Sequence, residues 1–291
     1  METTQANAPH LDEGSTILLI GGPGSGKSYS LSTIIEAGLK LAVVGTERSY
    51  LESVMQSITD RKLDQSKLYY HHIYPGATPW PLLIEMADNI NKLSFAALSS
   101  MKGGFNKEKY TQFREVIQTL YNFQDERTGK LLGPVDQLDP SEWAVAIDSL
   151  TGLSMMSMLA VVGTRPTAAE GEWGVAMNQL EQFGNACTSN IKCFFVMTGH
   201  IERESDPTGL SGTQMYVSTL GRKLSPKWGR FYSEVIHAYR EGDKYYWSTA
   251  TPMFDLKKRF LPLSDKITPS FAPLIEAWRK RRSQQKKEAA E

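Results

Sequence analysis

Gly21-Gly22-Pro23-Gly24-Ser25-Gly26-Lys27-Ser28 is the stretch of this 291-residue sequence that decides the fold. It fits the pattern G-x-x-x-x-G-K-[ST] in full. The apolar run Thr16–Ile20 precedes it, as a buried parallel strand would, and Lys27–Ala37 reads as a helix closed by Gly38. A strand, a glycine-rich turn and a helix in this order predict a phosphate-binding loop.

Each part of this loop has a physical role in binding phosphate. Glycines let the backbone N–H groups turn inward, and the start of the following helix favours an anion. We expect Lys27 to reach the β- and γ-phosphates and Ser28 to hold Mg²⁺. The alternative is a chance glycine-rich turn. The predicted ATP-binding residues are Gly21, Gly22, Pro23, Gly24, Ser25, Gly26, Lys27, Ser28 and Tyr29.

Strands alternate with helices along much of the chain. After the first strand, the predicted buried strands are Leu41–Gly45, Trp143–Ile147 and Ile191–Thr198, and the predicted helices are Arg48–Ile58, Leu150–Val162 and Glu172–Thr188. This alternation predicts an α/β fold with a mainly parallel central sheet flanked by helices.

The C-terminal part has a different pattern. Ser233–Arg240 and Lys244–Ala250 flank Glu241-Gly242-Asp243, which predicts a β-hairpin. A last helix follows, with Phe271, Leu274, Ile275 and Trp278 on one face, and this spacing predicts packing against the body.

We expect one main domain over 15–278, between a flexible leader (1–14) and a basic flexible tail (279–291). Residues 60–140 interrupt the strand–helix rhythm and predict a helical insertion. Its expected parts are a strand at Leu68–Tyr74, helices at Pro79–Leu98 and Lys107–Phe123, and a mobile loop at Thr128–Pro140. A second long flexible loop is expected at Ile201–Gly221.

Bulk composition limits the class of protein. A hydrophobic content of 41% is enough for a core, and no apolar run approaches the roughly 20 residues that cross a bilayer. Two cysteines make no disulfide framework, and the first residues lack signal-peptide character, so we expect a cytoplasmic protein. The 32 basic and 32 acidic residues balance, so any contact with DNA must come from local patches.

Two carboxylates stand at predicted strand ends. Asp148 ends the strand before Ser149 and fits a Walker B residue that binds Mg²⁺ through a water; the alternative is a helix cap. Because Ser149 and not Glu follows it, the carboxylate that activates the attacking water must come from elsewhere. Glu47, after the strand Leu41–Gly45, is our candidate; the alternative is an acidic residue favoured by a helix dipole.

His200 closes a further predicted strand, where a polar side chain would face the γ-phosphate and could sense hydrolysis. The alternative is an ordinary loop histidine. We find no metal-ligand spacing in the sequence beyond the Mg²⁺ that accompanies the nucleotide.

Together these features resemble the RecA-type ATPase core, which includes recombinases and DnaB-type helicases. The distinguishing element is Asp148-Ser149 with a separate Glu47. The chain is most similar to phage single-strand-annealing ATPases with a RecA-like core, through Thr198-Gly199-His200 and through Lys257-Lys258-Arg259 before Leu261-Pro262. The resemblance covers roughly 15–50 and 143–275.

The resemblance implies roles for several basic residues. Lys257 and Arg259 would be fingers that complete the neighbouring subunit's active site in a ring or filament, where an arginine can be worth about 10³-fold in rate. Two loops would face DNA: Gly163–Gly171 with Arg165, and Ile201–Gly221 continuing to Arg222 and Lys223. Arg203 and Tyr216 lie in the second loop. The alternatives are solvated charges and ordinary loops.

Three functions stay open at this stage. The first is an ATPase that acts on single-stranded DNA in phage-type recombination or strand annealing, in the host cytoplasm. The second is a ring-forming helicase or translocase motor. The third is a nucleotide-regulated protein-interaction module without DNA activity. His200 where recombinases usually have Gln, the long 60–140 insertion and the balanced charge count against the DNA role more than against the ATPase role.

Overall fold

The computed structural model describes residues 14–100, 110–163, 165, 167–205 and 213–288. Its central sheet has the strand order β11-β10-β1-β7-β6-β2-β3. These strands are β1 (Thr16–Gly21), β2 (Lys40–Gly45), β3 (Leu68–His72), β6 (Trp143–Asp148), β7 (Phe194–Gly199), β10 (Glu234–Glu241) and β11 (Lys244–Ser248). All pairs are parallel except β10 with β11. The predicted α/β fold class with a mainly parallel sheet is confirmed.

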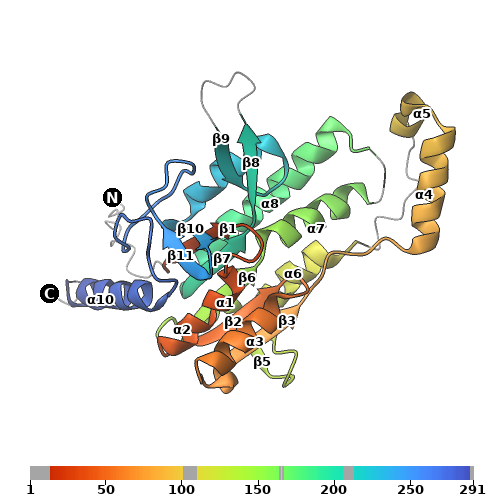
Figure 1. Ribbon diagram of the computed structural model, residues 1–291. Helices are drawn as coiled ribbons and strands as arrows, with labels where there is room; N and C mark the ends of the chain where they lie inside the picture. Colours follow the sequence, from red (N-terminus) through yellow and green to blue (C-terminus); the bar gives the residue numbers. More distant parts are fainter. Residues whose placement is uncertain (1–13, 101–109, 164, 166, 206–212, 289–291) are drawn as a thin grey trace, which may run out of the picture.

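Helices cover both faces of the sheet, as Figure 1 shows. One face carries α1 (Lys27–Ser30), α2 (Ser32–Glu36), α3 (Tyr50–Asp60) and α10 (Ala272–Glu288); the other carries α6 (Gln112–Tyr121), α7 (Leu150–Val162) and α8 (Glu170–Asn190). Each face has its own hydrophobic core. Side chains alternate along each strand, so Ile17 and Leu19 of β1 point into the core under α2, α3 and α10, and Leu18 and Ile20 point into the core under α6, α7 and α8. Both faces are therefore buried, which explains the near-continuous apolar strands.

The C-terminal hairpin and the last helix are both confirmed. Strands β10 and β11 pair around Gly242, whose φ is 59°. The apolar face of the helix is buried: Phe271, Leu274, Ile275 and Trp278. The helix continues to Glu288, so the tail predicted to be flexible from 279 is helical as far as it is described. Arg279 Nη1 donates to the Ala37 carbonyl at 2.9 Å, and the Arg282 guanidinium lies over the Trp278 ring.

Within 60–140, the short 3-10 helix η1 (Gln65–Lys67) leads into β3 at the sheet edge, and α6 packs into the core. In contrast, α4 (Trp80–Lys92) and α5 (Phe95–Ser100) extend away from the body (Figure 1). The first residues of the helix predicted at Lys107–Phe123 lie outside the described part of the chain, as does the leader up to residue 13.

The prediction of a mobile loop at Thr128–Pro140 is wrong. Strand β5 (Leu131–Gly133) pairs with β4 (Phe123–Gln124), and a 3-10 helix, η3 (Val135–Gln137), follows. Val135 and Leu138 are buried in the core, so two apolar residues among many turn formers are enough to fix the segment.

The prediction of a long flexible loop at Ile201–Gly221 is also wrong for its described part. Strands β8 (Ile201–Ser205) and β9 (Thr213–Val217) form an antiparallel hairpin, followed by α9 (Gly221–Leu224) and the 3-10 helix η4 (Ser225–Phe231). Residues 206–212 lie outside the described part. Val217 is buried in the core, and Ile201 and Met215 pack against it. These apolar contacts hold the base of the hairpin.

The parallel order brings several sequence-predicted residues to one edge of the sheet. Strands β1, β7, β6 and β2 are consecutive neighbours, and their carboxyl ends lead into the glycine-rich loop, His200, Asp148 and Glu47. Ligands bind at this edge in open parallel α/β sheets. No helix among the described residues combines the length and apolarity that a membrane span requires.

Candidate nucleotide-binding site

The loop from Gly21 to Ser28 turns tightly, and the glycines are needed for geometric reasons. Gly24 and Gly26 have φ of 68° and 83°, which side chains rarely tolerate. A Cβ on Gly21 would lie 2.2 Å from the Ala238 carbonyl oxygen. Lys27 is buried, and its Nζ donates to the carbonyls of Gly21 at 2.8 Å and Gly22 at 2.9 Å. Burial lowers the pKa of Lys27, and the charges of Asp148 and Glu47 oppose this effect.

Asp148 and Ser28 fit a magnesium site. Asp148 is 1% exposed; its Oδ1 accepts from Thr198 Oγ1 at 2.6 Å, whereas its buried Oδ2 has no hydrogen-bond partner among the described residues. Burial raises the pKa of this carboxyl, and the hydroxyls of Ser28 and Thr198 oppose the rise. A buried carboxylate oxygen without a partner, beside a serine hydroxyl, offers the hard oxygen atoms that Mg²⁺ prefers.

Glu47 lies beside this pair and is held by two neighbours. Ser149 Oγ donates to its carboxylate, and His200 Nε2 lies 3.1 Å from it. Burial would raise the pKa of Glu47, but hydrogen bonds from His200 and Ser149, and the charges of His200 and Lys27, lower it overall. The structure therefore brings together Lys27, Asp148, Glu47 and His200, four side chains predicted from separate segments.

Thr46 is part of this arrangement, although no motif in the sequence points to it. Its Oγ1 donates to the Ser149 carbonyl at 2.8 Å and accepts from the Ser149 amide at 2.7 Å. A Cβ on Gly152 would lie 2.3 Å from the Thr46 hydroxyl oxygen, so α7 approaches β2 closely here. Thr46 thus fixes the turn from which Ser149 reaches Glu47.

The glycine-rich loop and the side chains beside it border a hollow of about 1080 Å³. The loop, Glu47, Asp148 and His200 lie along one part of it. The rest is lined by side chains that the sequence did not point to: Ser49, Glu52, Ser53, Gln56, Arg61, Lys244, Tyr245, Tyr246, Thr268 and Pro269. Tyr245 packs directly over Gly26, where an added Cβ would lie 3.0 Å from the ring. The volume and the mixed lining suit a nucleoside triphosphate.

Tyr29 also lines this hollow, and its ring is fixed from two sides. Its hydroxyl donates to Asp60 Oδ2 at 3.0 Å, and the Arg61 guanidinium lies 5.8 Å from the ring centroid. The sequence alone could not show this anchoring.

Lys257 and Arg259 do not line the hollow of their own chain. Lys257 pairs with Val235 near the start of β10, and its Nζ donates to the Tyr232 carbonyl at 2.7 Å. The Arg259 amide donates to Glu234 Oε1 at 2.8 Å, and its guanidinium lies over Phe260. Both residues are exposed. They lie near the end of the sheet where the parallel strands begin, whereas the glycine-rich loop lies at the end where these strands finish.

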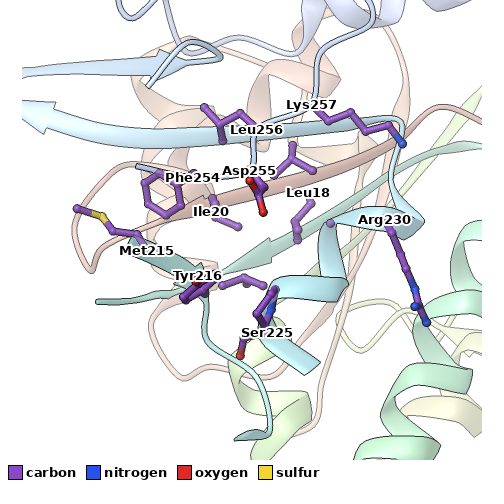
Figure 2. Close-up of a pocket in the computed structure, with 14 residues that line it drawn as sticks. Leu18, Ile20, Met215, Tyr216, Ser225, Arg230, Phe254, Asp255, Leu256 and Lys257 are labelled. Carbon is purple, nitrogen blue, oxygen red and sulfur yellow. The ribbon is translucent and has the colours of Figure 1, made fainter. Parts of the chain in front are cut away.

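A second hollow, of about 290 Å³, is lined by apolar side chains together with Arg230, Asp255 and Lys257. Figure 2 shows Leu18 and Ile20 of β1 on one side, with Phe254 and Leu256 above them and Met215 of β9 at the end. It shares no lining residue with the hollow beside the glycine-rich loop, which we call the nucleotide hollow for the ligand that it suits.

The structure does not gather the residues predicted to bind DNA. Arg165 forms an ion pair with Glu172 at the start of α8. Arg203 pairs with Met215 and Tyr216 with Glu202, so Arg203 and Tyr216 face opposite sides of the hairpin. Lys223 is exposed on α9, and the side chain of Arg222 lies outside the described part.

No protein-family model matches the chain, and no curated protein matches it. Among solved structures, the chain is similar to one described as the crystal structure of the RadB recombinase. The identity is 15%, the TM-score is 0.43, and the alignment covers 87% of this chain and 84% of that one.

Proposed function

We propose that this protein is a Mg²⁺-dependent ATPase with a RecA-like core that acts on single-stranded DNA. One observation carries the ATPase proposal: the Glu47 carboxylate is held by Ser149 and His200 at the edge of the hollow that Lys27 and Asp148 also line. A phosphate-binding loop alone would bind a nucleotide. A fixed carboxylate beside it adds the group that hydrolysis requires.

The roles follow from the geometry. Lys27 and the loop amides bind the β- and γ-phosphates, and Asp148 with Ser28 holds the magnesium ion. The ion supplies charge neutralisation at the phosphates. Glu47 orients a water and accepts its proton, and its lowered pKa keeps it ionised for that task. Tyr245, exposed by 45% and stacked over the loop, offers a flat surface to the rest of the nucleotide.

Lys257 and Arg259 act on a neighbouring subunit in this proposal. Both side chains are exposed and outside their own nucleotide hollow, as residues that serve another copy must be. An oligomer of the head-to-tail kind would bring them to the next γ-phosphate. Mixing tests this part: inactive Lys27→Ala and inactive Arg259→Ala proteins should together regain activity, because some interfaces then combine an intact loop with an intact finger.

The finer proposal is a phage-type protein of recombination or strand annealing, working in the host cytoplasm. It is supported by the resemblance of Thr198-Gly199-His200 and Lys257-Lys258-Arg259 to annealing ATPases. Steady-state ATP hydrolysis with and without single-stranded DNA, at low and moderate salt, tests the DNA role. Stimulation that weakens with salt is expected, and an unstimulated ATPase would contradict it. Lys27→Ala should abolish nucleotide binding.

A nucleotide-regulated interaction protein is the second candidate, and helix α4 favours it. Trp80 is 78% exposed and Ile84 62% exposed on a helix that extends from the body. Apolar side chains displayed in this way often mark a protein interface. Slow hydrolysis that no nucleic acid alters would support this candidate over the first.

A further inference from the structure

A third hollow, of about 470 Å³, shares the glycine-rich loop as a wall with the nucleotide hollow. Pro23, Gly24 and Ser25 border both spaces. The other walls come from the β8–β9 hairpin, through Ile201, Arg203 and Met215, and from residues 237–240 of β10. Whatever binds here lies next to the segment that holds the phosphates.

A row of aromatic rings adjoins this hollow on one face of β10 and β11. The His237 and Tyr239 rings are stacked, with centroids 5.5 Å apart and planes 19° apart. Tyr246, the β11 partner of Tyr239, extends the row at 5.7 Å, and Phe254 extends it at the other end, 4.5 Å from His237. His237, Tyr239 and Tyr246 are all partly exposed. Phe254 is buried and Tyr246 lines the hollow beside the glycine-rich loop, so His237 and Tyr239 are the rings that this third hollow offers to flat groups.

Two arginines border the same hollow. Arg203 on β8 and Arg240 on β10 are exposed, and neither forms an ion pair within the described residues. The neighbouring acid Glu241 is engaged by Lys266 at 2.5 Å. Burial, with the charges of Lys27 and Arg203, lowers the pKa of His237 to about 4. The hollow is therefore positive, and a cationic side chain of another subunit would be repelled from it.

We propose that this hollow binds single-stranded nucleic acid, with Arg203 and Arg240 on the phosphodiester groups and the His237 and Tyr239 rings stacking against bases. Two cations that form no ion pair among the described residues, set beside stacked rings, are the combination that single strands require, since every base presents a flat face. The inference rests on the proposed function and locates the single-strand site: the strand would contact the loop that holds ATP. The β10 face was not among the sequence-predicted DNA residues.

The test is fluorescence anisotropy of a labelled oligothymidylate, longer than one site size of about 16 nucleotides. Arg203→Ala/Arg240→Ala should weaken binding at least about tenfold and flatten the dependence of affinity on salt. The matched control, Arg114→Ala/Lys227→Ala, removes two exposed charges from α6 and η4 and should bind as wild type does. Thermal unfolding and binding of a fluorescent ATP analogue establish that each variant is folded.

A second pair of variants separates stacking from charge. Tyr239→Leu should weaken binding by about fivefold or more, because it removes a ring face. Tyr239→Phe should bind as wild type does, because it loses the hydroxyl bond to Asp265 but keeps the ring.

The outcomes distinguish this inference from the function on which it rests. Wild-type protein that binds ATP but no oligonucleotide would overturn both. Wild-type affinity in both Arg203→Ala/Arg240→Ala and Tyr239→Leu would overturn the inference alone. Displacement of the oligonucleotide by millimolar inorganic phosphate would show a phosphate site, and equal displacement by duplex would show binding without strand preference; each contradicts the proposal.

Discussion

His200 Nε2 lies 3.1 Å from the Glu47 carboxylate, although 153 positions separate the two residues in the chain. His200 follows β7 and Glu47 follows β2, and β6 with Asp148 lies between these strands. The contact thus spans the edge of the sheet above Asp148, the carboxylate that we propose binds magnesium. Strand β8 begins at Ile201, directly after His200, so a change at Glu47 can reach the hairpin that borders the third hollow through the hydrogen bond to His200.

His200→Ala should impair hydrolysis in a way that depends on pH. The His200 hydrogen bond helps to lower the pKa of Glu47, so its loss raises that pKa and moves the acidic limb of the rate profile to higher pH. We expect a fall in kcat of about tenfold to a hundredfold, because the carboxylate also loses its orientation. His200→Gln, which keeps a donor, should recover most of the rate. An unshifted acidic limb in His200→Ala would contradict this role.

Asp148→Asn should separate stability from ligand binding. Burial raises the pKa of Asp148, so its charge at neutral pH costs folding free energy that the neutral amide avoids. The nucleotide-free variant should unfold at higher temperature, by about 2–4 °C for each kcal/mol relieved. The extra stabilisation that Mg²⁺ with ADP gives the wild-type protein should disappear. Thermal unfolding measures both, and a variant stabilised by Mg²⁺ with ADP as wild type is would contradict the metal assignment.

Much of the site was predictable because chemistry in a parallel sheet sits at strand ends. The loop, Asp148, Glu47 and His200 each follow an apolar run, and the sheet order brings them together. Thr46 and Tyr245 were not predictable. Thr46 acts through a backbone contact with Ser149, 103 positions away, and Tyr245 meets Gly26 only because the hairpin folds over the loop. Such contacts follow from tertiary packing and have no local pattern.

Two loop predictions failed for a related reason. Glycine, proline and charged residues around 201–221 and 128–140 have low strand propensity, but cross-strand pairing and a few buried apolar side chains outweigh it. Val217 and Val135 are those buried anchors. Propensity describes what a segment prefers alone, and these hairpins are stabilised by the body on which they pack.

Glu234 should make stability depend on pH. Its side chain is buried, its Oε1 accepts from the Arg259 and Phe260 amides, and burial raises its pKa to about 7. The pKa of Glu234 in the folded protein exceeds the unfolded value of 4.5. Its stabilising contribution to the free energy of unfolding is therefore fully present below about pH 4.5 and is lost as pH rises through 7. The shift corresponds to about 3 kcal/mol.

Glu234→Gln should remove most of that dependence, so its unfolding free energy should change less between pH 5 and pH 8 than that of wild type. Urea unfolding at the two pH values measures the difference. Glu276→Gln, which changes an exposed carboxylate on α10, is the control and should behave as wild type does. Equal pH dependence in wild type and Glu234→Gln would refute the assignment.

Two glycines should respond in opposite directions to alanine. A Cβ on Gly45 would lie 1.7 Å from the ring of buried Tyr50, so Gly45→Ala should lower the unfolding free energy by about 1–3 kcal/mol or more. Gly174 lies within α8 with no atom near an added Cβ, so Gly174→Ala should raise it by roughly 0.5–1 kcal/mol. Denaturant unfolding tests both, and a neutral Gly45→Ala would show that β2 and α3 are less closely packed than described.

The central claim is that Glu47 activates the attacking water, and Glu47→Gln tests it most directly. The measurement is the single-turnover rate of ATP hydrolysis, beside the affinity for a fluorescent ATP analogue in the same preparation. We predict a rate lower by about 10²–10⁴-fold, with the nucleotide still bound. Glu47→Gln protein that binds ATP and hydrolyses it at the wild-type rate would contradict the account.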